Sequence, residues 1–168
     1  MIETPTQYTQ RIRQYVDGRE PIDVQARTAA RLGQLIAGVS TANVRKRPAP
    51  DRWSVSEIAA HLADAEIVIG YRLRLILGSP GTSIVAYDQD RWVTSGHYDA
   101  REPQASVQLF RVLRDANLAL LDALDAEQWA HYGVHSERGQ ESIADVVRMT
   151  AGHDVNHLRQ IEQILVSA

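Results

Sequence analysis

Two histidines near the carboxyl end, His153 and His157, stand four residues apart in the segment AGHDVNHLRQIEQIL. Positions four apart on a helix are neighbours, with roughly 5–6 Å between Cβ atoms, so both imidazoles can reach one metal ion. Ile161 and Ile164 continue the same side, which predicts that the pair faces a core. Such pairs also occur by chance on helix surfaces, but a buried imidazole left without a partner costs about 1–3 kcal/mol, and a bound ion removes that cost.

A third histidine, His61, lies on the apolar side of another expected helix. A lone inward histidine is more often a core residue hydrogen-bonded to a carbonyl or carboxylate, and that alternative stays open. Three neutral nitrogen ligands would leave coordination positions for water or substrate, which is typical of catalytic zinc sites, whereas structural sites are closed. His61, His153 and His157 are therefore the candidate metal ligands.

Several other polar residues lie near these histidines in the sequence, and each has a different expected role. Asp64 and Asp154 are close enough in sequence to orient an imidazole, although we interpret Asp154 as a solvated helix residue. Gln160 is either a hydrogen-bond donor or acceptor for a bound water or ligand, or a residue at the rim. Arg72 follows His61 by three helical turns, about 16 Å along the axis, too far to touch the metal, so we expect a structural role paired with Asp88.

Apolar spacing and helix-stop residues predict four long amphipathic helices after a short one that ends before Gly18. A Ser-x-x-Glu or Ser-x-x-Asp capping box opens the second helix and the fourth. The long helices are expected over residues 24–39 with Asp23 as N-cap, from Val55 to Leu77, after Pro103, and after Ser142.

The connections between these helices are uneven in length. About 25 residues separate the second long helix from the third, more than antiparallel neighbours need. We therefore predict an all-α fold, a four-helix bundle with up-down-down-up order and a long crossover between helices 2 and 3, as one domain over residues 1–168. Residues 125–140 are expected to hold a short helical turn and a small hairpin.

Composition narrows the class of protein. The 168 residues are 44% hydrophobic and include no cysteine, so disulfides, thiolate ligands and a cysteine nucleophile are excluded. A net charge of −3 gives no electrostatic footprint for nucleic acid, and the basic run Arg45 to Arg47 is expected to be a solvated loop. The chain shows neither a long apolar run nor a secretory signal, so we expect a cytoplasmic protein with no membrane partner.

The histidine segments and several shorter motifs resemble the DinB/YfiT-like family of metal-dependent proteins. The resemblance covers nearly the whole chain and rests on the order and spacing of the motifs together. The matching stretches are RWSVSEIAAHLADAE with Trp53, Ser54 and His61, then Arg72, then YDQDRW with Tyr87, Asp88 and Trp92, then HSERG from His135 to Gly139, and finally GHDVNHLRQIEQI.

The resemblance implies a four-helix bundle in which His61, His153 and His157 hold zinc, nickel or a similar divalent ion. Some members of the family are similar to S-transferases that use bacillithiol, and a mycothiol-dependent maleylpyruvate isomerase belongs to the same superfamily. Others have no assigned activity. The resemblance assigns no substrate-binding residue and no catalytic residue beyond the three ligands.

The leading expectation is a metal-dependent transferase or isomerase that acts on a small molecule with a low-molecular-weight thiol. The alternatives are a metal-dependent hydrolase, with a carboxylate such as Asp64 as base, and a bundle that binds a metal or ligand without turnover. A carboxylate within reach of the metal would favour hydrolysis, and a roomy basic pocket would favour a thiol. Apolar area around Tyr8 and Tyr15 predicts a homodimer.

Overall fold

The computed structural model describes residues 4–167, and most of them are helical. Four long helices form the bundle: α2 (Pro21–Ile36), α4 (Val55–Gly78), α6 (Pro103–Asp122) and α8 (Ile143–Val166). The shorter helices are α1 (Pro5–Gln14), α3 (Thr41–Arg45), α5 (Gln89–Ser95), α7 (Ala126–Ala130) and the 3-10 turn η1 (Tyr98–Ala100). The predicted all-α class is confirmed. No helix in the described residues combines the length and apolar character needed to cross a membrane.

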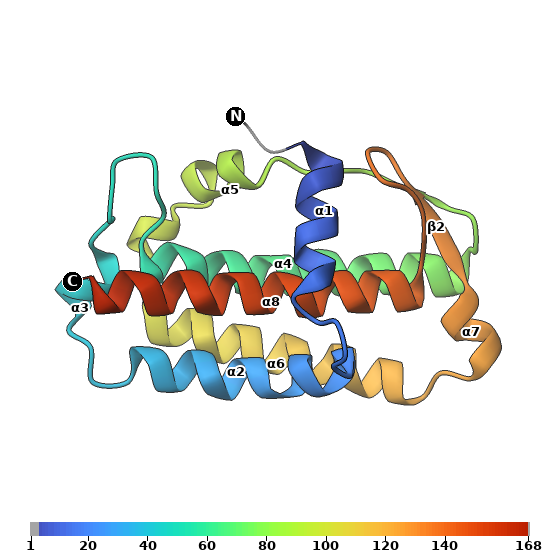
Figure 1. The fold of residues 1–168 in the computed structure, drawn as a ribbon, viewed down its shortest axis with the longest axis horizontal. Helices are drawn as coiled ribbons and strands as arrows, with labels where there is room; N and C mark the ends of the chain where they lie inside the picture. Colours follow the sequence, from blue (N-terminus) through green and yellow to red (C-terminus); the bar gives the residue numbers. More distant parts are fainter. Residues whose placement is uncertain (1–3, 168) are drawn as a thin grey trace.

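The long helices have the predicted up-down-down-up order. In Figure 1, α4 and α6 run in one direction, while α2 and α8 run in the other. The crossover between α4 and α6 contains β1 (Ser83–Ile84), α5 and η1, and it returns the chain along α4 to the end where α4 began. The length of this connection is what allows α4 and α6 to be parallel neighbours.

A small sheet closes one end of the bundle. Strands β2 (Tyr132–His135) and β3 (Gly139–Ser142) form the expected antiparallel hairpin, and β1 joins it in parallel with Ile84 opposite His135. Gly139 has a φ of 76°, a left-handed conformation that glycine adopts without strain after the turn. The sheet thereby fixes the crossover and the hairpin next to α4.

Two of the three N-cap residues predicted from the sequence are confirmed. Ser54 and Ser142 each form the capping box that opens α4 and α8. The prediction of Asp23 as an N-cap is wrong, because α2 already begins at Pro21 with Glu20 as N-cap. Proline at the first helical position has a preset φ and lacks only an N–H that would be unbonded there, so it starts the helix earlier.

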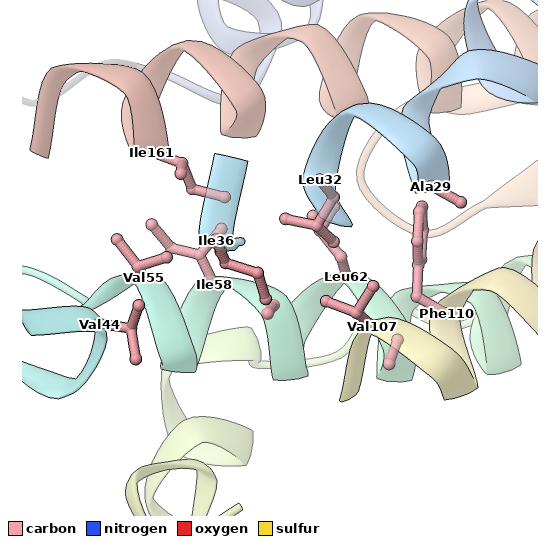
Figure 2. Close-up of a cluster of buried hydrophobic side chains, with 12 residues drawn as sticks. Ala29, Leu32, Ile36, Val44, Val55, Ile58, Leu62, Val107, Phe110 and Ile161 are labelled. Carbon is pink, nitrogen blue, oxygen red and sulfur yellow. The ribbon is translucent and has the colours of Figure 1, made fainter. Parts of the chain in front are cut away.

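Side chains from all four long helices meet in the main core cluster, shown in Figure 2. A second cluster fills the end of the bundle nearer the sheet, around Leu73, Ile76 and Ile143. The main cluster contains Ala29, Leu32 and Ile36 of α2, Val55, Ile58 and Leu62 of α4, Val107 and Phe110 of α6, and Ile161 of α8. The apolar faces predicted for these helices are thus the buried ones.

The basic run from Arg45 to Arg47 is not simply solvated, as the sequence suggested. Arg45 pairs with Glu102 at 2.7 Å, and Arg47 donates to both carboxylate oxygens of Glu57. Glu57 is 1% exposed and also accepts from the backbone N–H of Ser54 at 2.8 Å. Burial alone would raise the pKa of Glu57, but the bonds from Arg47 and Ser54 outweigh it and hold that pKa below its ordinary value.

The Glu57→Gln variant is expected to lose about 1 kcal/mol of unfolding free energy at pH 7, because glutamine keeps the capping contact but loses the charge that faces Arg47. A carboxyl whose folded pKa is lowered stabilises the fold above its unfolded pKa and ceases to do so as the pH falls through the folded pKa. The difference between wild type and variant should therefore shrink at pH 3. Urea denaturation at both pH values measures it, and an equal difference at both would contradict the assignment.

Candidate metal centre

The three predicted histidines come together between α4 and α8. The Nε2 atom of His153 lies 3.0 Å from Nε2 of His61 and 3.1 Å from Nε2 of His157. Among the described residues, these three form a cluster whose ligand atoms all lie within 4.8 Å of one another. The i, i+4 spacing on α8 and the inward position on α4 thus produce the predicted convergence.

No placement of protons on the neutral rings gives both of these nitrogen–nitrogen contacts a hydrogen bond. An imidazole nitrogen carries either one proton or one lone pair in the ring plane. His157 Nδ1 lies 3.1 Å from Gln160 Oε1, which can only accept, so the proton of a neutral His157 is on Nδ1 and its Nε2 has a lone pair. Nε2 of His153 can form only one hydrogen bond, as donor or as acceptor, but two imidazole nitrogens lie beside it. At least one of these close contacts is therefore not a hydrogen bond.

A divalent ion fits the same atoms. Nitrogen ligands about 2.0–2.1 Å from one ion are roughly 2.9–3.4 Å apart, depending on the coordination geometry. The two separations that involve His153, 3.0 and 3.1 Å, fall in this range, and all three ligand atoms lie within 4.8 Å of one another. Three neutral nitrogens and no thiolate form a donor set that suits zinc or nickel. The residues present are therefore compatible with the metal that the sequence predicts.

The electrostatic environment keeps these imidazoles neutral. Burial lowers the pKa of His61 and of His153 well below the ordinary value, and the neighbouring His157 lowers both further. Burial lowers the pKa of His157 to about 4, although the bond to Gln160 opposes this shift. At neutral pH all three rings are therefore in the unprotonated form that coordination requires.

Two neighbouring side chains fix the orientation of the rings. Gln160 is bonded to the outer nitrogen of His157, a contact that neither of its two predicted roles included. Trp53 packs with its ring centroid 4.8 Å from that of His61 and stacks on His157 at 6.2 Å. Fixing the outer nitrogen of a ligand histidine holds its tautomer, so Gln160 is a positioning residue.

Helix α1 crosses α8 (Figure 1), and its Ile12 meets Gly152, the residue before His153. A Cβ on Gly152 would lie 2.1 Å from the carbonyl oxygen of Ile12, so only glycine permits this close approach of the two backbones. The crossing brings Tyr8 and Thr9 into the wall of the pocket that also contains His153. No sequence pattern indicated that the first helix belongs to the site.

A pocket of about 430 Å³ opens next to His153. Of the three histidines, only His153 lines it, and His153 is half-buried whereas His61 and His157 are buried. The accessible side of the cluster therefore faces the pocket. Its wall includes the apolar residues Val68, Ile69, Val146 and Met149 and the polar residues Arg72, Tyr87, Asp88, His135, Glu137 and Arg138.

The interpretation of Asp154 as a solvated residue is wrong. Asp154 is fully buried and accepts from Arg114 at 2.5 and 3.0 Å. Arg114 also donates to Glu66 at 2.8 Å, and Asn117 donates to the other oxygen of Glu66 at 3.0 Å. This buried network joins α4, α6 and α8 at the helical turn that carries His153.

Two further expectations for polar residues also fail. Asp64 accepts from Tyr98 and from Arg101, each at 2.7 Å, and none of its hydrogen bonds reaches an imidazole. Arg72 does not pair with Asp88, which instead caps α5. It donates to the carbonyl oxygen of Val85 at 3.0 Å. In both cases the crossover supplies a partner whose position the sequence did not indicate.

Comparison with known proteins supports the same family. A sequence model of the DinB superfamily matches residues 25–161, which include all three histidines. A protein of Oceanobacillus iheyensis, named a "putative metal-dependent hydrolase", is 26% identical over 133 residues, covering 79% of this chain and 76% of the relative. YfiT of Bacillus subtilis, with the same kind of name, is 22% identical over 144 residues, covering 85% and 81%.

Two solved structures share the fold. The structure of Bacillus subtilis YfiT, described as having an unusual four-helix bundle topology, aligns with a TM-score of 0.81 at 21% identity, covering 86% of this chain and 83% of YfiT. A mycothiol-dependent maleylpyruvate isomerase aligns with a TM-score of 0.63 at 13% identity, covering 80% of this chain and 58% of the isomerase. The superfamily model matches residues 25–161, most of the chain, and this chain therefore belongs to the DinB superfamily.

Proposed function

We propose that this chain is a metal-dependent transferase or isomerase that uses a low-molecular-weight thiol at the site formed by His61, His153 and His157. The observation that carries the proposal is the pocket of about 430 Å³ beside His153, which has Arg72 and Arg138 in its wall. The chain has no cysteine, so the thiol must belong to a second molecule, and the pocket offers the space for it. Zinc and nickel are the metals that the donor set favours.

The residues around the pocket have separate roles in this proposal. The three neutral imidazoles hold the ion, and Gln160 keeps His157 in the tautomer whose Nε2 is free to coordinate. A divalent ion held by these histidines would lower the pKa of a thiol bound to it, so that the nucleophilic thiolate would form near neutral pH. The apolar wall, with Val68 and Val146, excludes water from the sulfur.

Hydrolysis is the second candidate, because the relatives in Oceanobacillus iheyensis and Bacillus subtilis carry that name. A hydrolase needs a base for the attacking water. Asp64 is bound by Tyr98 and Arg101, which leaves Asp88, whose Oδ1 caps α5, and the exposed Glu137 as the carboxylates in the pocket wall. The space beside His153, together with Arg72, which forms no ion pair in the described residues, favours the thiol.

Metal-loaded protein is expected to accelerate the conjugation of bacillithiol or mycothiol to 1-chloro-2,4-dinitrobenzene. In this reaction a carbon–sulfur bond forms, a carbon–chlorine bond breaks, and chloride and a proton are released. The rate should fall by at least about 100-fold in His157→Ala, since even residues outside the ligand set typically change activity by 10–100-fold. Absorbance of the dinitrophenyl thioether measures the rate.

Chelated protein and chelated protein with restored metal are the controls, and the same samples are assayed for ester and amide hydrolysis. A thiol-dependent rate that chelation removes and metal restores supports the proposal. No thiol-dependent rate above the free-metal background, together with metal-dependent hydrolysis that Glu137→Gln abolishes, would replace it with the second candidate.

A further inference from the structure

The wall of the pocket contains Arg72, an arginine without a carboxylate partner among the described residues. Within residues 4–167, Arg72 forms no ion pair, and its one hydrogen bond goes to the carbonyl oxygen of Val85. Its guanidinium also lies 5.8 Å from the ring centroid of Tyr87. An arginine has five N–H donors, so most of those on Arg72 have no protein acceptor.

His135 lines the same pocket and has an unsatisfied donor. Its Nδ1 accepts the backbone N–H of Glu137 at 3.2 Å, so the proton of the neutral ring is on Nε2. His135 is 2% exposed, and in the part of the chain that the structure describes its Nε2 has no hydrogen-bond partner. Buried donors without an acceptor are rare in proteins, and a ligand is one explanation for them.

Arg72 is the cation in the pocket wall that forms no ion pair within residues 4–167. Arg138 is already neutralised by Glu141, with two bonds of 2.7 Å. Two exposed carboxylates, Asp88 and Glu137, also line the pocket, but solvent screens their charges. Burial and the two arginines lower the pKa of His135, so it is a neutral donor. One cation and one neutral donor match a single negative charge.

We infer that Arg72 and His135 form a subsite for one carboxylate group of the molecule that occupies the pocket. The inference rests on the proposed function for the identity of that molecule, which becomes a thiol or thiol adduct with a carboxylate remote from its sulfur. Arg72 follows His61 by 11 positions on α4, about 16 Å along the axis, and an arginine side chain leans back toward the helix start. The sulfur and carboxylate must therefore lie on the order of 10 Å apart.

The test compares 4-phenylbutyrate with 4-phenylbutyramide, which have similar size but differ in charge. Wild-type protein should bind the acid at least about tenfold more tightly, because charge-assisted hydrogen bonds are stronger than neutral ones. Arg72→Gln should remove this preference and leave amide binding unchanged. Arg111→Gln, an exposed arginine of α6 outside the pocket, is the matched control and should keep the preference. Calorimetry measures all affinities.

His157→Ala separates this subsite from the metal centre, since an acid could also bind a metal. A preference that persists in His157→Ala and disappears in Arg72→Gln supports the subsite, even if the thiol assay is negative and the proposed function fails. Equal binding of acid and amide by wild-type protein, or a preference lost in His157→Ala and kept in Arg72→Gln, overturns it. If Arg72→Gln does not fold, Arg72→Lys should retain a reduced preference, and an unchanged or absent preference in that variant overturns the subsite.

Discussion

Arg114→Met is expected to lower the free energy of unfolding by about 3–5 kcal/mol, the largest stability effect we predict for a single substitution. Arg114 is 1% exposed and is bonded to two buried carboxylates, Glu66 and Asp154. Methionine fills much of the same volume, but it leaves two carboxylates in the core without a cation. Urea denaturation at pH 7 measures the loss.

Arg111→Met is the matched control for this substitution. Arg111 lies one turn before Arg114 on α6 and is exposed, so its replacement should change the unfolding free energy by no more than about 0.5 kcal/mol. Similar losses in the two variants would show that the buried network does not stabilise the bundle. If only Arg114→Met shows a large loss, this variant is also expected to bind metal less tightly. The reason is that Asp154, which Arg114 holds, is adjacent to the ligand His153 on α8.

His153→Ala is expected to weaken metal binding by more than about 100-fold, since even residues that only support a ligand typically contribute 10–100-fold. Nε2 of His153 lies between the other two imidazoles, 3.0 and 3.1 Å from their Nε2 atoms. Its removal leaves two nitrogens on different helices and opens the cluster to the pocket. Competition with a chromophoric chelator measures the affinity for zinc and for nickel.

The control for this variant is a histidine outside the cluster. His97 is exposed and has a φ of 50°, a left-handed conformation that asparagine tolerates better than alanine, so His97→Asn is the appropriate change. It should bind the metal as wild type does. If His153→Ala still binds a full equivalent with unchanged affinity, the assignment of the ligands is wrong.

The histidine cluster could be predicted because local periodicity determines it. The spacing of His153 and His157 and the inward position of His61 depend only on helical geometry and on which face is apolar. The bundle order could likewise be predicted from the long connection before Pro103. These features need no knowledge of how distant side chains pair.

The buried charges and the pocket wall could not be predicted in the same way, because their partners come from distant segments. A signal was nevertheless present: Arg114 occupies the apolar stripe of α6 between Phe110 and Leu121, and Glu66 lies between Leu62 and Leu73 on α4. Opposite charges on two buried faces indicate an ion pair. The placement of His135 and Arg72 in one pocket wall depends on the sheet register, in which Ile84 lies opposite His135, and no local pattern indicated it.

The most direct test of the metal centre is a crystal structure of protein purified without an affinity tag, with anomalous diffraction recorded at the absorption edge of the metal found by elemental analysis. The account predicts one anomalous peak per chain, within about 2.0–2.1 Å of Nε2 of His61, His153 and His157. A peak that contacts fewer than three of these nitrogens, or metal-replete crystals with no peak between α4 and α8, would contradict it.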